Sequence, residues 1–117
     1  ALEIALAVYG EGHPVVGTAL NNLASVLQDL GDLAGAKERF EQALEIHLAV
    51  YGPKHPDVGT TLNNLALVLQ DLGDLAGAKE RFERALEIAL AAYGEGHPKV
   101  DLIAQNLKVV KEELGET

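Results

Sequence analysis

The chain has 117 residues, of which 48% are hydrophobic, and its nine Lys and Arg against eighteen Asp and Glu give a formal net charge of −9. An acidic surface repels phosphate backbones and anionic lipid, and no apolar run reaches the ~18 residues of a membrane span, so we expect neither nucleic acid nor a membrane as partner. The absence of cysteine excludes disulfides and thiolate zinc sites and fits a cytoplasmic protein.

The sequence repeats with a period of 42 residues. A third copy begins at Ala85 and drifts after Val100. Periods of this length are typical of stacked supersecondary units, none of which can bury its apolar face alone. The first two copies, residues 1–42 and 43–84, differ only at Ala5/His47, Glu11/Pro53, Gly12/Lys54, Val15/Asp57, Ala19/Thr61, Ser25/Leu67 and Gln42/Arg84.

Helix signals divide the chain in order. Residues 1–12 form part of a second helix and a connector, residues 13–54 and 55–96 each form a full helix pair, and residues 97–117 form a terminal helix. The first helix of each unit opens at His-Pro, because proline suits the first helical turn. It closes at Leu-Gly-Asp, where glycine ends one helix and aspartate caps the next. Such short junctions predict antiparallel pairs.

Apolar residues follow helical spacing along these segments, as in the run Leu20, Leu23, Ala24, Leu27 and Leu30. In the last copy Lys108 and Lys111 replace Ala and Leu on this stripe. A buried, unpaired ammonium is unfavourable, so we expect the terminal helix to be a cap with a wet outer face.

The residues that recur resemble those of a known family. Its marks are Leu20-Asn21-Asn22-Leu23-Ala24, Gly31-Asp32, Ala36, Ala43-Leu44-Glu45-Ile46 and Gly52-x-x-His55-Pro56, which look like the 42-residue tetratricopeptide-type repeats of the kinesin light chain family. The resemblance implies an all-α, right-handed α-solenoid, a TPR-like superhelix of antiparallel helix pairs. It also implies that the first helices line a concave groove in which asparagines bind the backbone of an extended peptide.

Catalysis and cofactors have little support. His13, His55 and His97 recur one unit apart, too far for one metal ion, and we expect them to contact the exposed N–H groups of the helix that each precedes. His47 stands alone, with Ala5 and Ala89 at its equivalents, and is interpreted as a surface or groove-edge residue. No serine or cysteine triad can be assembled. We therefore expect no enzyme, no metal and no cofactor.

Paired amides are the most informative polar residues. Asparagine is unfavourable inside a helix, so Asn21-Asn22 and Asn63-Asn64 need a compensating role. Either they bind a peptide or they bond the adjacent repeat as a structural ladder. We expect Asn22, Asn64 and Asn106 to be the structural members, because only that column is unbroken, and a bound peptide to follow Asn21, Asn63 and Gln105.

One face of the first helices would form the peptide groove. No Lys or Arg is expected there, and Asp29, Asp71 and Glu112 flank it, so the predicted partner is a neutral or basic protein segment rather than an acidic one. The predicted groove residues are Thr18, Asn21, Asn22, Ser25, Gln28, Thr60, Asn63, Asn64, Leu67, Gln70, Gln105, Asn106 and Val109.

The sequence thus predicts a protein- or peptide-binding scaffold. One alternative is a structural spacer or self-associating fragment without a ligand, which the near-identity of the units favours. Another is the sensor arm of a larger signalling ATPase. Leu2, Leu6 and Tyr9 would leave an apolar side uncovered, which predicts either a twofold homodimer through the amino-terminal half-helix or head-to-tail stacking.

Overall fold

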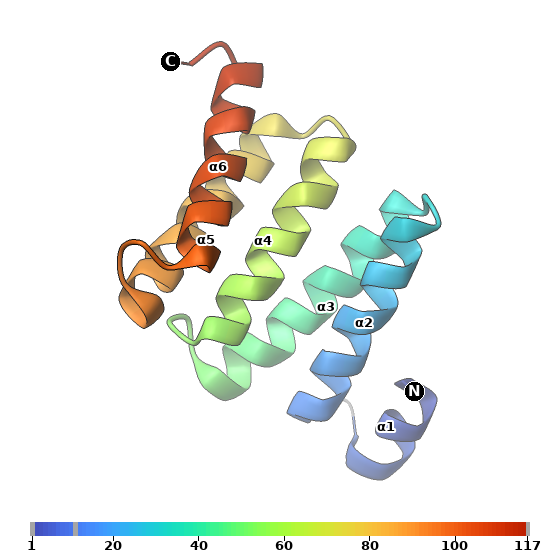
Figure 1. Ribbon diagram of the computed structural model, residues 1–117. Coiled ribbons are helices and arrows are strands. Elements are labelled where there is room, and N and C mark those ends of the chain that lie inside the picture. Colours follow the sequence, from blue (N-terminus) through green and yellow to red (C-terminus); the bar gives the residue numbers. More distant parts are fainter. Residues whose placement is uncertain (1, 11, 117) are drawn as a thin grey trace.

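The computed structural model describes residues 2–10 and 12–116, and these form an all-α structure without strands. The first helices of the units lie in one row and the second helices in a row behind them, with the two ends of the chain at opposite ends of the stack (Figure 1). The helices are α1 (Leu2–Tyr9), α2 (Pro14–Asp29), α3 (Leu33–Tyr51), α4 (Pro56–Asp71), α5 (Leu75–Tyr93) and α6 (Pro98–Glu113).

The His-Pro pairs begin α2, α4 and α6 as expected. In each case the histidine Nδ1 accepts a hydrogen bond from the backbone N–H two residues later, at 3.0 Å for His55 and 3.1 Å for His13 and His97. This confirms that the recurring histidines contact the exposed N–H groups of the helix start. Proline follows at the first helical position, where its missing N–H costs nothing.

The Leu-Gly-Asp junctions also act as predicted. Gly31 and Gly73 have φ of 86° and 90°, a region that residues with a Cβ rarely adopt. Asp32 and Asp74 then cap α3 and α5, each accepting the N–H of the third following residue at 3.0 Å. The chain therefore reverses its direction within three residues, which makes α2/α3 and α4/α5 antiparallel pairs.

The core lies between the two rows. Phe40 and Phe82 are completely buried at its centre, surrounded by small residues such as Ala24, Ala66 and Ala78. Alanine at these positions lets the helix axes approach closely, and the phenylalanine rings fill the remaining volume. Because α3 packs against both α2 and α4, and α5 against both α4 and α6, the pairs share one continuous core.

Equivalent residues differ in burial according to what packs on them. Helix α4 is covered by α3 on one side and α5 on the other, and Val68 is 0% exposed. Its equivalent on α2, Val26, is 53% exposed, because α2 has only the eight-residue α1 on the corresponding side. The same side chain is thus a core residue in one unit and a surface residue in the other.

The lysines of α6 are not buried. Lys108 is exposed, Lys111 is half-buried, and both border a hollow of about 550 Å³ with Leu86 and Leu107. This arrangement is what the cap hypothesis requires, and the cap itself stays a prediction. None of the described helices combines the length and the apolar character needed to cross a membrane.

Truncation of the two equivalent valines tests the continuous core. Val68→Ala removes two fully buried methyl groups and should lower the free energy of unfolding by about 2 kcal/mol, measured by urea denaturation. Val26→Ala is the matched control in the same sequence context and should cost less than about 0.5 kcal/mol. Equal costs would contradict the unequal packing of α2 and α4.

Candidate functional site

The predicted groove residues lie on α2, α4 and α6. These three helices are neighbours, since α4 contacts both α2 and α6. The predicted residues from Thr18 to Gln28 lie on α2, and those from Thr60 to Gln70 lie on α4. The remaining three, Gln105, Asn106 and Val109, lie on α6. The predicted set is therefore spread over three neighbouring helices, and we call the side of these helices that carries it the amide face.

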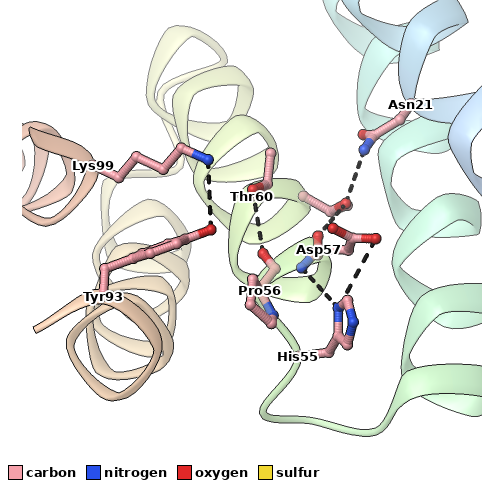
Figure 2. Close-up of polar contacts among 8 residues, drawn as sticks. Asn21, His55, Pro56, Asp57, Thr60, Tyr93 and Lys99 are labelled. Carbon is pink, nitrogen blue, oxygen red and sulfur yellow. Dashed lines mark hydrogen bonds and ion pairs between the residues drawn. The ribbon is translucent and has the colours of Figure 1, made fainter.

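A hydrogen bond joins the first two helices of this face. The Nδ2 of Asn21 donates to the Oγ1 of Thr61 at 3.0 Å, and Figure 2 shows Asn21 pointing from α2 toward α4. Thr61 is 0% exposed and in turn donates to the backbone carbonyl of Asp57 at 3.1 Å. The NH2 group of Asn21 is therefore held by the contact between repeats, whereas its Oδ1 is buried without a hydrogen-bond partner among the described residues.

The second junction uses a different acceptor. Asn106 Nδ2 on α6 donates to Asn63 Oδ1 on α4 at 3.2 Å. The residue of α6 equivalent to Thr61 is Ile103, which has no hydroxyl and is buried at 6% exposure. Asn63 consequently bonds an amide of the next helix rather than a hydroxyl. We call the Asn21–Thr61 and Asn63–Asn106 bonds the amide ladder.

The ladder corrects the expected division of roles. Asn106 is a structural member as predicted, but Asn22 and Asn64 are not. Successive helical residues point about 100° apart, so when Asn21 faces α4 its neighbour Asn22 faces solvent. Within the described residues, no hydrogen bond is made by the side chains of Asn22, which is exposed, and Asn64, which is half-buried. Asn21 and Asn63, predicted as peptide ligands, are the residues held by the neighbouring repeat.

Some of the other polar side chains of the amide face already make hydrogen bonds within the chain. Ser25 and Thr60 donate to the backbone carbonyls of Asn21 and Pro56 within their own helices, at 3.1 Å and 3.2 Å. Gln70 donates through Nε2 to Glu113 Oε1 of α6. Thr18 and Gln105 are exposed.

The middle column of the face is mixed in character. Ser25 and Leu67 are half-buried and Val109 is 38% exposed, so an apolar surface develops toward α6. The flanking carboxylates Asp29, Asp71 and Glu112 are exposed, as expected.

His47 corrects a second prediction. It lies in the core at 2% exposure, and neither ring nitrogen has a hydrogen-bond partner in the described part of the chain. Its ring occupies the space beside Gly17 of α2, where an added Cβ would lie 2.7 Å from Nε2. The alanines at the equivalent positions suggested a surface site, yet alanine is also the residue of close helix packing. That ambiguity explains the wrong assignment.

Tyrosine rings at the helix connectors were not anticipated. Tyr51 stacks on His55 with ring centroids 4.2 Å apart, and Tyr93 stacks on His97 at 4.5 Å. Lys99 lies 5.1 Å from the centroid of Tyr93 and approaches its hydroxyl, a contact drawn in Figure 2. The recurring Tyr-Gly-x-x-His spacing was the available signal. These stacks hold the cap histidines in place.

A hollow of about 670 Å³ lies at the amino-terminal end of the stack. Its apolar wall contains Leu2, Leu6, Val16 and Leu20, and Arg39, Gln42 and Glu45 are the polar residues of its lining. Of the predicted uncovered residues, Leu2 is half-buried and Leu6 is 39% exposed, whereas the side chain of Tyr9 lies outside the described residues. Within the described chain, no group of three or more His, Asp or Glu side chains is placed to hold a metal ion.

A double-mutant cycle tests the amide ladder. Asn21→Ala and Thr61→Val should show a coupling free energy of about 0.5–1.5 kcal/mol in urea denaturation, because each variant alone already removes the shared hydrogen bond. The cycle cancels the helix propensity that alanine gains over asparagine. Asn22→Ala with Thr61→Val is the control and should be additive; a coupling as large as that of Asn21 would contradict the assignment.

Comparison with known proteins agrees with this architecture. The family model for the tetratricopeptide repeat matches residues 1–49, 15–91 and 57–117, which together span the chain. None of the curated proteins compared with the chain matches it.

Two solved structures share the fold. The crystal structure of BtubC (BKLC) from P. vanneervenii has a TM-score of 0.89 and 26% identity, over 98% of this chain and 46% of that one. A Podosopora anserina putative kinesin light chain with nearly identical TPR-like repeats has a TM-score of 0.91 and 23% identity, over 98% and 55%. This chain thus spans about half of each. The chain belongs to the tetratricopeptide repeat family.

Proposed function

We propose that the chain binds an extended protein segment along the amide face. Tetratricopeptide repeats are generally protein-interaction modules, and the observation that supports this particular face is the pair of unbonded amides, Asn22 and Asn64. Both lie beside a ladder residue, on first helices that the ladder joins. An amide provides both a donor and an acceptor, so a row of them matches the alternating N–H and C=O groups of a peptide backbone.

The ladder explains how these amides are positioned. Asn21 and Asn63 tie α2 to α4 and α4 to α6, which fixes the spacing of the neighbouring Asn22 and Asn64. Preorganised groups lose little conformational entropy on binding. Gln105, exposed on α6, would extend the row, and Leu67 and Val109 would receive an apolar side chain of the ligand.

Charge favours a neutral or basic ligand. Asp29, Asp71 and Glu112 are exposed beside the amide face, and the predicted groove set contains no cation. An acidic peptide would meet like charge without a compensating Lys or Arg. The ligand class proposed here is therefore an extended, neutral or basic peptide segment of another protein, and the mode of action is scaffolding without a catalytic step.

The test is an array of 12-residue peptides in basic, neutral and charge-reversed acidic series, with affinities of the hits measured by fluorescence anisotropy. Asn22→Ala/Asn64→Ala should weaken binding about tenfold, as expected for two lost hydrogen bonds, without lowering stability. Glu87→Gln, on the exposed side of α5, is the control and should bind normally. Unchanged affinity of the asparagine variant would refute the proposed face.

The salt dependence checks the charge preference separately. Binding of a basic peptide should weaken when salt is raised from low to moderate concentration, since exposed charges are screened. Tighter binding of an acidic peptide than of its charge-reversed counterpart would exclude the proposed ligand class while leaving the amide face as the binding site.

Self-association is the second candidate. Large apolar side chains are exposed on the first two helices, namely Ile4 at 67%, Val8 at 66% and Val26 at 53%, and Leu30, which directly follows α2, is 77% exposed. They lie at the same end of the stack as the 670 Å³ hollow. Association about a twofold axis would bury them twice and close the assembly, whereas head-to-tail contact would continue it.

Light scattering across a concentration series tests self-association. A twofold contact should give a mass that reaches a plateau at the dimer, and Ile4→Glu should abolish it because the carboxylate would be desolvated in the interface. Leu102→Glu, also on an exposed apolar residue but on α6, is the control and should leave the dimer intact. A monomer at every concentration contradicts the dimer, and mass without a plateau indicates head-to-tail stacking.

A further inference from the structure

His47 occupies an unusual place for a titratable side chain. It lies on α3, the helix that packs between α2 and α4, and is 2% exposed. Nδ1 and Nε2 are both buried without a partner in the described residues. The equivalent positions in the adjoining units hold Ala5 and Ala89, which are also buried, at 5% and 4%. The repeat therefore does not need a histidine here for its fold.

The surroundings of the ring are mostly apolar. Gly17 of α2 lies against the ring, and Ile46 borders the same space. The Tyr51 ring, also on α3, has its centroid 5.6 Å from that of His47. A larger residue at position 17 would collide with the imidazole, so the ring fills its site fully. A positive charge here would lose its contact with water, and neither nitrogen makes a hydrogen bond that would compensate for this loss, which is unfavourable.

Charged and titratable groups near the ring come from the start of α4. Asp57 favours the protonated imidazole, and His55 disfavours it. From α2, the carbonyl of Pro14 also favours protonation, but it does not reach hydrogen-bond geometry with either nitrogen. Asp57 is largely exposed and lies 3.9 Å from the His55 imidazole, so water screens its effect on His47. Burial is the largest influence and lowers the pKa of His47.

We propose that His47 is an acid-sensitive element that loosens the first helix pair. When the ring takes up a proton it must leave the space beside Gly17 to reach water, and α2 and α3 separate there. The second pair, α4 and α5, has Ala89 at this position and keeps its packing. Acid would thus open the chain at one defined place, next to the Asn21–Thr61 bond that starts the amide ladder.

The direction of the pH effect follows from linkage. A base whose pKa is lower in the folded than in the unfolded state binds fewer protons when folded. The stability that neutral His47 provides is fully present above the unfolded pKa near 6.5, and it is lost as the pH falls below that value toward the lowered pKa. The expected window of acid sensitivity therefore begins just below pH 6.5.

Urea denaturation of the whole chain at pH 7.5 and pH 5.0 tests the proposal, with His47→Ala as the variant. Alanine is the residue of both neighbouring units, so the variant should fold. When the pH is lowered from 7.5 to 5.0, the unfolding equilibrium constant of the wild type should increase by a factor that is roughly threefold or more larger than the factor for His47→Ala. The other histidines are the same in both proteins. Equal pH dependence of the two proteins would overturn the proposal.

Hydrogen exchange locates the opening. At pH 5.0 and after correction for intrinsic rates, amides of α2 and the second half of α3 should lose protection in the wild type, whereas those of α5 should not. His47→Ala should show no such difference between α3 and α5. Uniform loss of protection along the wild-type chain would contradict a local element and indicate general acid unfolding.

Discussion

The packing of α3 and α5, each between two first helices, is the constraint on which this molecule depends. Helix α3 contacts α2 through its own pair and α4 through the next, so its residues must fit two partners at once. Phe40 and Phe82 are completely buried as a result. A single pair could not bury these faces, and stability arises from the interfaces between neighbours. The contrast between Val26 and Val68 follows directly, since identical sequence does not give identical surroundings.

Hydrogen bonds between polar side chains fix how the helices of this apolar stack are aligned along one another. Apolar packing alone tolerates small slips between helices, whereas the Asn21–Thr61 and Asn63–Asn106 bonds require one alignment of α2, α4 and α6. The cost of asparagine in a helix is offset by these contacts for one member of each pair. For the other members, Asn22 and Asn64, no contact within the described chain offsets this cost. Their amides therefore remain available for a ligand, which is the physical basis of the proposed function.

Helix limits and pairing could be predicted because their signals are local. His-Pro and Leu-Gly-Asp act through bonds within a few residues, and the structure begins α2 at Pro14 and α3 at Leu33 accordingly. The choice between Asn21 and Asn22 could not be predicted, because it depends on the rotation of α2 against α4. His47 was misplaced for a related reason: an alanine at equivalent positions is compatible with both a surface and a close contact.

The positions at which the units differ are informative about the junctions. Thr61 replaces Ala19 and supplies the acceptor for Asn21, while the third unit has Ile103 there and bonds Asn63 through Asn106 instead. His47 replaces Ala5 and fills the space beside Gly17. The Thr61 substitution changes the contact between two helix pairs, whereas the His47 substitution changes the packing within the first pair, and both leave the helices intact. Nearly identical units therefore make different contacts with the helices around them. Exchanging two units would change these contacts, although the helices would still form.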